Sequence, residues 1–158
     1  MIARRVLLAA SFAVCAALGP TALPLSCQDS QSGPASGTWE LPSGSGKSDG
    51  FIDGILYLAP ADTVRFYFDA TLTDVFTPSL SQIKGTIDGI LDDGFGPAPD
   101  YVVKGSYVGN ANTGSGTFTC VIRRPGSTQD VGKIDGTFAD APGSTTPGTF
   151  SGEWKITQ

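Results

Sequence analysis

The chain has 158 residues, a length that suits one domain, and it contains no histidine. The lack of histidine excludes a Ser-His-Asp or Cys-His catalytic triad and any metal centre that needs imidazole ligands. Fifteen acidic against ten basic side chains give a net charge of −5, which disfavours nucleic acid as a partner. Apolar residues make up 40% of the chain, which is enough for a buried core.

The N-terminal segment has the pattern of an export signal. Residues 1–5 include two arginines, and residues 6–18 form an uncharged apolar run that stops at Gly19-Pro20. A basic head and a short apolar run are typical of a secretory signal peptide, here over residues 1–26. The run is shorter than the about 20 residues of a membrane-spanning helix. The sequence predicts a periplasmic or extracellular protein, with an uncleaved membrane anchor as the alternative.

Cys27 is the predicted attachment point of a lipid. The run Leu23-Pro24-Leu25-Ser26-Cys27 resembles, in part, the lipobox of bacterial lipoproteins, whose cysteine becomes the lipidated first residue. The residues that follow are polar and small, so 27–36 are expected to form a polar tether before the domain at 37–158. Cleavage near Ala22 by ordinary signal peptidase is the alternative.

Two cysteines, Cys27 and Cys120, remain once Cys15 has left with the signal. In an oxidising compartment such a pair suggests a disulfide. The strand pattern, however, points Cys120 into the core, where a partner on a loose tether would reach it only with difficulty. We therefore expect lipidation at Cys27 rather than a Cys27–Cys120 bridge, and two free thiols are the third alternative.

Hydrophobic alternation with a period of two predicts eight strands in the rest of the chain. The clearest case is residues 64–72, where Val64, Phe66, Phe68, Ala70 and Leu72 share one side and Arg65 lies on the other. The remaining predicted strands cover residues 37–41, 51–58, 82–91, 101–108, 116–123, 131–138 and 149–157.

The intervals between these runs are short and rich in Gly, Pro, Asn and Asp, which predicts turns and antiparallel neighbours. Eight sequential antiparallel strands favour closure into an up-and-down β-barrel, because closure removes both exposed sheet edges. Seven glycines at the inward phase support sharp coiling, with large neighbours filling the space that they leave. They are Gly54, Gly85, Gly89, Gly105, Gly116, Gly136 and Gly152. A two-sheet β-sandwich is the alternative.

The first strand opens with Gly37-Thr38-Trp39 and the last strand carries Trp154. In these features and in strand number the chain resembles the small barrels of the avidin and lipocalin type, which implies a barrel fold. The chain departs from those families in having no ring of inward tryptophans. The base nearest the end of the last strand is Lys155, at an outward position. The resemblance therefore implies a fold and no particular ligand.

The inward side is almost wholly apolar, so an apolar ligand would be lined by aromatic side chains. The candidates are Trp39, Phe66, Phe68, Tyr107, Phe118, Phe138 and Trp154. The acidic strand residues fall on the outward side, where they are expected to be solvated: Asp53, Asp69, Asp88, Asp135 and Glu153. Charges on the outward side also disfavour a transmembrane barrel.

The two ends of a barrel collect alternate loops. The end with both termini is expected to gather Asp62, Asp92, Asp93, Asp100 and Asp130 with Arg123 and Arg124. Clustered aspartates can bind calcium, but no EF-hand pattern is present, so no metal or other cofactor is predicted. The opposite end carries the longer loops over residues 42–50, 74–80, 109–115 and 140–148. It would face away from a membrane that holds Cys27, where a ligand or partner could bind; the alternative is that these loops are merely permissive turns.

The sequence thus predicts an exported, lipid-anchored, non-catalytic barrel that acts by binding. An apolar ligand inside the barrel is the first hypothesis, and it needs the inward glycines to leave a cavity. The alternative is a protein-binding module, such as an inhibitor of a basic hydrolase, because an acidic surface suits a cationic partner. An enzyme of the barrel-cyclase type is the third.

Overall fold

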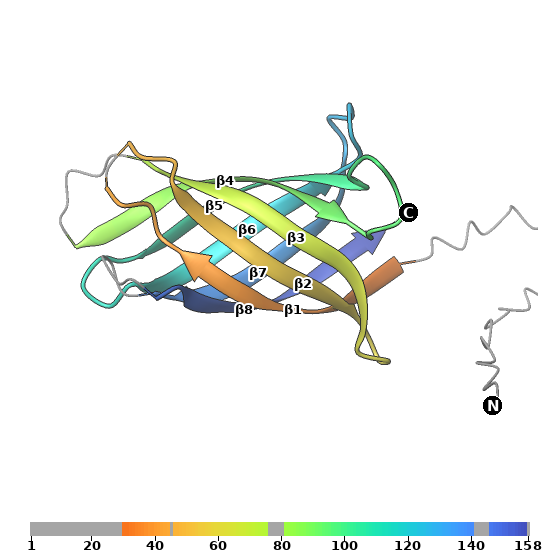
Figure 1. The fold of residues 1–158 in the computed structure, drawn as a ribbon, viewed down its shortest axis with the longest axis horizontal. Helices are drawn as coiled ribbons and strands as arrows, with labels where there is room; N and C mark the ends of the chain where they lie inside the picture. The colour runs from red at the N-terminus through yellow and green to blue at the C-terminus, as the bar shows by residue number, and fades with distance from the viewer. Residues whose placement is uncertain (1–29, 45, 76–80, 141–145, 158) are drawn as a thin grey trace, which may run out of the picture.

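The computed structural model describes residues 30–44, 46–75, 81–140 and 146–157, and these form one closed antiparallel β-barrel. Its strands are β1 (Ser30–Glu40), β2 (Gly50–Leu58), β3 (Thr63–Asp74), β4 (Gln82–Asp92), β5 (Tyr101–Asn110), β6 (Ser115–Arg123), β7 (Asp130–Ala139) and β8 (Gly148–Thr157). Each strand pairs with the next one in the sequence, and β8 pairs with β1 (Figure 1). The predicted up-and-down barrel is confirmed, and the sandwich is excluded because the ladder is continuous. None of the described residues forms a helix long and apolar enough to cross a membrane.

The first strand begins at Ser30, seven residues earlier than predicted. Residues 30–36, which were expected in the polar tether, belong instead to β1. The whole strand pairs with β8, from the pair Ser30–Thr157 to the pair Trp39–Gly148. The prediction failed because the inward positions here carry Gly33 and Ala35, which give no hydrophobic alternation. Small residues are required at this point, since a Cβ on Gly33 would collide with the Tyr57 carbonyl. Residues 27–29 and the predicted signal peptide lie outside the described residues.

The predicted inward positions form the core or pack against it, with one exception on β3. Val64 is 49% exposed, although the alternation placed it inward. The cause is a register shift between Leu56 and Tyr57 of β2: Leu56 faces Phe66, but Tyr57 faces Val64. Arg65 is the extra residue of this bulge, and a bulge reverses the side to which the preceding residues point.

Aromatic rings fill the space over the inward glycines. A Cβ on Gly136 would lie 2.6 Å from the Phe118 ring and 2.5 Å from the Ser151 carbonyl oxygen. A Cβ on Gly116 would lie 2.7 Å from the Phe138 ring. Tyr107, Phe138 and Trp154 were the large neighbours expected at these places, and the expectation is confirmed for Phe138 and for Tyr107, whose ring lies over Gly85. The glycines therefore allow bulky rings to fit inside a narrow barrel, and they do not leave the space empty.

Gly136→Ala tests this tight contact. The added methyl must push against both the Phe118 ring and a backbone carbonyl, so the free energy of unfolding should fall by about 1–3 kcal/mol. Gly44→Ala is the matched control, because a Cβ there meets nothing within 4 Å and should change stability by less than about 1 kcal/mol. Urea denaturation of both variants measures the difference, and equal stabilities would show that the interior has room.

Candidate functional site

The seven aromatic residues predicted to line a ligand cavity are all buried, and each has a ring contact with another aromatic side chain of the core. Their exposed fractions are 4% or less: Trp39, Phe66, Phe68, Tyr107, Phe118, Phe138 and Trp154. The Trp39 and Phe138 rings stack with centroids 4.5 Å apart and planes 4° from parallel. Phe66 meets Trp154 edge to face at 5.7 Å. The structure brings these residues together as a barrel core, in an arrangement typical of aromatic packing.

Polar atoms are rare in this interior. The Trp154 indole N–H donates to the Tyr57 carbonyl at 2.9 Å. The Trp39 indole nitrogen and the Tyr107 hydroxyl are buried and have no hydrogen-bond partner among the described residues. Burial raises the pKa of the Tyr107 hydroxyl above its usual range, and the nearby Asp74 carboxylate adds to the shift. Tyr107 is therefore a neutral core residue at physiological pH.

Cys120 lies at the inward position that the sequence predicts, and it is 1% exposed with a free thiol. Burial raises the pKa of this thiol to about 12, and the Asp135 carboxylate contributes. A thiol with so high a pKa is not a nucleophile at neutral pH. Cys27, the other half of the alternative disulfide and the predicted lipid site, lies outside the described residues.

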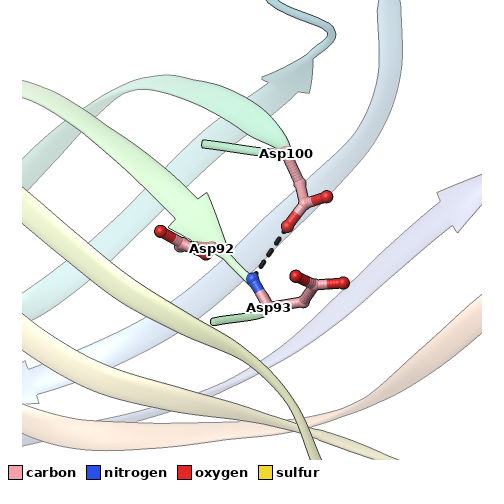
Figure 2. A group of neighbouring side chains, drawn as sticks. All are labelled: Asp92, Asp93 and Asp100. Carbon is pink, nitrogen blue, oxygen red and sulfur yellow. Dashed lines mark hydrogen bonds between the residues drawn. The ribbon is translucent and has the colours of Figure 1, made fainter. Parts of the chain in front are cut away.

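Three of the aspartates expected at the termini end do lie together, around the β4–β5 connection. Figure 2 shows the side chains of Asp92, Asp93 and Asp100. Each offers a carboxylate oxygen, and these oxygens lie within 4.8 Å of one another. All three accept hydrogen bonds from the loop backbone. The Asp93 N–H donates to Asp100 at 2.7 Å, the Gly94 N–H to Asp92 at 2.7 Å, and the Phe95 N–H to Asp93 at 3.0 Å. These bonds explain the cluster as a brace for the loop.

The other residues expected at this end are arranged differently. The Asp130 carboxylate pairs with Arg123 at 2.6 Å. Asp62 is exposed and adopts a positive φ of 47° in the β2–β3 turn. Arg124 is also exposed and forms no ion pair among the described residues. A calcium site built from all five aspartates therefore does not assemble here.

Arg65 connects three parts of the termini end, a role that alternation did not reveal because it placed this residue on the solvated side. Its guanidinium carbon lies 4.3 Å from the centre of the Phe66 ring. Its Nε donates to the Gln31 side chain at 3.0 Å, and its Nη1 lies 3.6 Å from Asp93. Arg65 thus ties the start of β1 to the base of the β4–β5 loop while it covers the core ring beneath it. The bulge is what turns it to this position.

At the opposite end, the structure reveals a buried charge that the sequence analysis missed. Asp140 is only 7% exposed, and its carboxylate accepts a hydrogen bond from the Leu41 N–H at 2.7 Å. Its own N–H donates to the Gly114 carbonyl at 2.6 Å. Asp140 thereby joins the β1–β2, β5–β6 and β7–β8 connections, at the end where the sequence predicted ligand or partner binding. Residues 45, 76–80 and 141–145 of these loops lie outside the described residues.

The outer wall of β2, β3 and β4 carries an acidic groove. Asp53 and Asp69 lie directly opposite each other on neighbouring strands, and neither forms an ion pair among the described residues. Partial burial raises the pKa of Asp69, and the charges of Asp53 and Asp92 raise it further. The concavity has a volume of about 510 Å³ and also exposes apolar side chains; its walls are Phe51, Ile52, Asp53, Asp69, Ala70, Thr71, Asp88, Gly89, Ile90 and Val102.

Of the other predicted outward acids, Asp88 and Asp135 have cation partners. Asp88 pairs with Lys104 on the neighbouring strand β5. The Asp135 carboxylate accepts hydrogen bonds from Lys133 at 2.5 Å and from Thr119 at 2.5 Å, and both contacts lower its pKa. Glu153 lies opposite Asp135 on β8, lines the same concavity as Lys133 and Lys155, and forms no ion pair among the described residues. Asp53 and Asp69 thus face each other on neighbouring strands, and neither has an ion-pair partner within the described strands.

Fold and surface together define a small up-and-down barrel with a filled interior and an acidic outer groove. Comparison with protein-family models, curated proteins and solved structures finds no match for this chain. The likeness of Gly37-Thr38-Trp39 to the avidin and lipocalin barrels stays a prediction.

Proposed function

We propose that the chain is an exported, lipid-anchored, non-catalytic barrel that binds a basic protein through the acidic groove on β2–β4. The observation that carries the proposal is that Asp53 and Asp69 face each other on the outer wall, and neither has an ion-pair partner among the described residues. Like charges directly opposite each other on neighbouring strands destabilise a sheet. A cationic partner would remove this cost, and so it would bind preferentially at this place.

The chemistry of the groove suits a lysine or arginine side chain. Such a side chain has an apolar stem and a charged head. Ile90 lies beside Asp69 in the sheet, and Val102 lies beside Ile90, so an apolar strip leads up to the carboxylate. A stem lying over Ile90 and Val102 would place its cation at Asp69 and Asp53. A basic hydrolase, with many such side chains, fits this description as a class of partner.

The interior favours this proposal over an internal apolar ligand. A ligand would have to displace rings such as Trp39 and Phe138, which stack on each other. One observation still favours the internal ligand as the second candidate: the Trp39 indole N–H and the Tyr107 hydroxyl have no partner among the described residues. A ligand with a polar group could satisfy them if the rings moved apart.

Lipid anchoring at Cys27 predicts a change of compartment on substitution. Cys27→Ser removes the thioether-forming atom, so the variant should leave the membrane fraction and appear among the soluble exported proteins. Cys120→Ser is the matched control and should stay with the membrane, because its thiol is buried inside the barrel. Fractionation followed by immunoblotting measures both. Membrane association of the Cys27→Ser variant would point to the uncleaved anchor instead.

The groove predicts charge-dependent binding. The double variant Asp53→Asn, Asp69→Asn should bind a basic hydrolase such as a lysozyme at least about tenfold more weakly than the wild type, a loss of about 1.4 kcal/mol. Its stability should be unchanged or slightly higher, since it also removes the repulsion between the two carboxylates. Calorimetric titration measures the affinity. Binding should also weaken at ~1 M salt, where the screening length falls to about 3 Å.

Glu153→Gln is the matched control, because it removes one carboxylate from the opposite wall at an equally outward position. It should bind as the wild type does. Net charge alone would give the control about half the loss of binding free energy of the double variant, because it removes one carboxylate and the double variant removes two. Undiminished binding by the double variant would refute the groove as the site.

A further inference from the structure

Phe95 is the most exposed large apolar side chain among the described residues, at 93%. It lies in the β4–β5 connection, between Gly94 and Gly96, and residues 94–99 carry no charge. A phenylalanine held fully in water gains nothing from folding, since its ring stays solvated. Its exposure points to a contact outside the chain.

The loop that carries Phe95 is braced at its base. The Asp92, Asp93 and Asp100 carboxylates accept hydrogen bonds from its backbone, including the Phe95 N–H. Gly94 has a φ of +79° and lies against the Tyr67 ring, so the chain makes a tight turn there. Two prolines follow within four residues of Phe95 and restrict the backbone further. A braced loop presents its ring with little loss of conformational entropy on binding.

The loop belongs to the end of the barrel at which the chain enters. Arg65 bonds to Gln31, the second residue of β1, and to Asp93 at the base of the loop. Figure 1 shows the β4–β5 connection at the same end as the C-terminus and the start of β1. Cys27 precedes Ser30 by three residues, which span at most about 11 Å when fully extended. A lipid on Cys27 would therefore hold this end close to the membrane surface.

Cations on the same end suit a membrane with anionic headgroups. Arg124, Lys133 and Lys155 surround a concavity of about 650 Å³ beside the β6–β7 connection. Arg124 and Lys155 form no ion pair in the part of the chain that the structure describes. Asp130 in the same concavity is neutralised by Arg123. Basic side chains and an exposed aromatic residue at one end of a domain suit contact with the headgroup region.

We propose that Phe95, with the uncharged residues 96–99, inserts among the lipid headgroups of the membrane that holds the chain, as a second membrane contact. This inference rests on the lipid anchoring proposed above. A second contact strengthens the attachment that the lipid provides. The contact also fixes the orientation of the barrel, because the acidic groove then projects sideways from a bound end and stays open to a partner.

The substitution Phe95→Trp reports directly on this contact. The full chain with Phe95→Trp is produced in a bacterium that lipidates exported proteins, and its intact mass is measured. It is then reconstituted into vesicles of phosphatidylethanolamine and phosphatidylglycerol, with and without brominated acyl chains. The native Trp39 and Trp154 are buried and give a constant background. We expect the emission of the introduced indole to shift to shorter wavelength and to be quenched by bromine.

Val108→Trp is the matched control. Val108 is 44% exposed on the outer wall, close to the opposite end of β5, roughly 20 Å along the strand from its start. The emission of this variant's introduced indole should be that of tryptophan in water and should not be quenched. Equal quenching of both variants would overturn the proposed orientation.

The mass and the quenching separate the two proposals. A lipid adduct on Cys27 without quenching in the Phe95→Trp variant overturns the membrane role of Phe95 alone, and would indicate that this ring contacts a protein. A product without a lipid adduct overturns the proposed anchoring at Cys27, and it also overturns the membrane contact of Phe95, which depends on that anchoring.

Discussion

Closure of the sheet is the constraint on which the rest of this structure depends. Ten consecutive residue pairs join β8 to β1 and leave the described strands with no open edge. An eight-stranded barrel has an interior just wide enough for side chains. The chain meets this limit by setting aromatic rings over glycines, as Phe118 lies over Gly136. The tight packing of the interior therefore depends on the inward glycines, because a Cβ at several of these positions would collide with the rings.

A filled interior decides where function can reside. Ionisable groups inside the barrel are held neutral, as the raised pKa values of Tyr107 and Cys120 show. Charge is left for the outer wall and the two ends. On the wall, Asp88 and Asp135 form ion pairs with lysines, but Asp53 and Asp69 face each other without a cation partner among the described residues. At the termini end, carboxylates brace a loop and leave Phe95 in water. The proposed functions follow from these two unsatisfied features.

The sequence predicted the architecture well, because period-two alternation and short turns determine strand number and direction. Ile134 and Phe138 illustrate this, since both are buried where the pattern placed them. The start of β1 was missed because Gly33 and Ala35 fill inward positions without being hydrophobic enough to reveal a strand. Val64 and Arg65 were assigned to the wrong sides because a bulge interrupts the alternation, and no residue in the run signals a bulge.

Functional groupings were harder to predict than strands, because they depend on the register between strands. Alternation placed Asp53 and Asp69 on the outer side but could not show that they face each other. It also grouped five aspartates at one end, of which three came together. Asp140 and its bond to Leu41 join residues 99 positions apart, a contact that only the closed barrel creates. The local alternation pattern determines whether a residue points into or out of the barrel. Its neighbours on other strands depend on the register, which the local pattern does not give.

The central claim is that the barrel is full and that binding takes place outside it. Native mass spectrometry of the protein purified from its own host tests this most directly. The account predicts the mass of the polypeptide with its covalent lipid, and no bound small molecule. A one-to-one apolar molecule that is released only on unfolding, and that the Asp53→Asn, Asp69→Asn variant also retains, would contradict it.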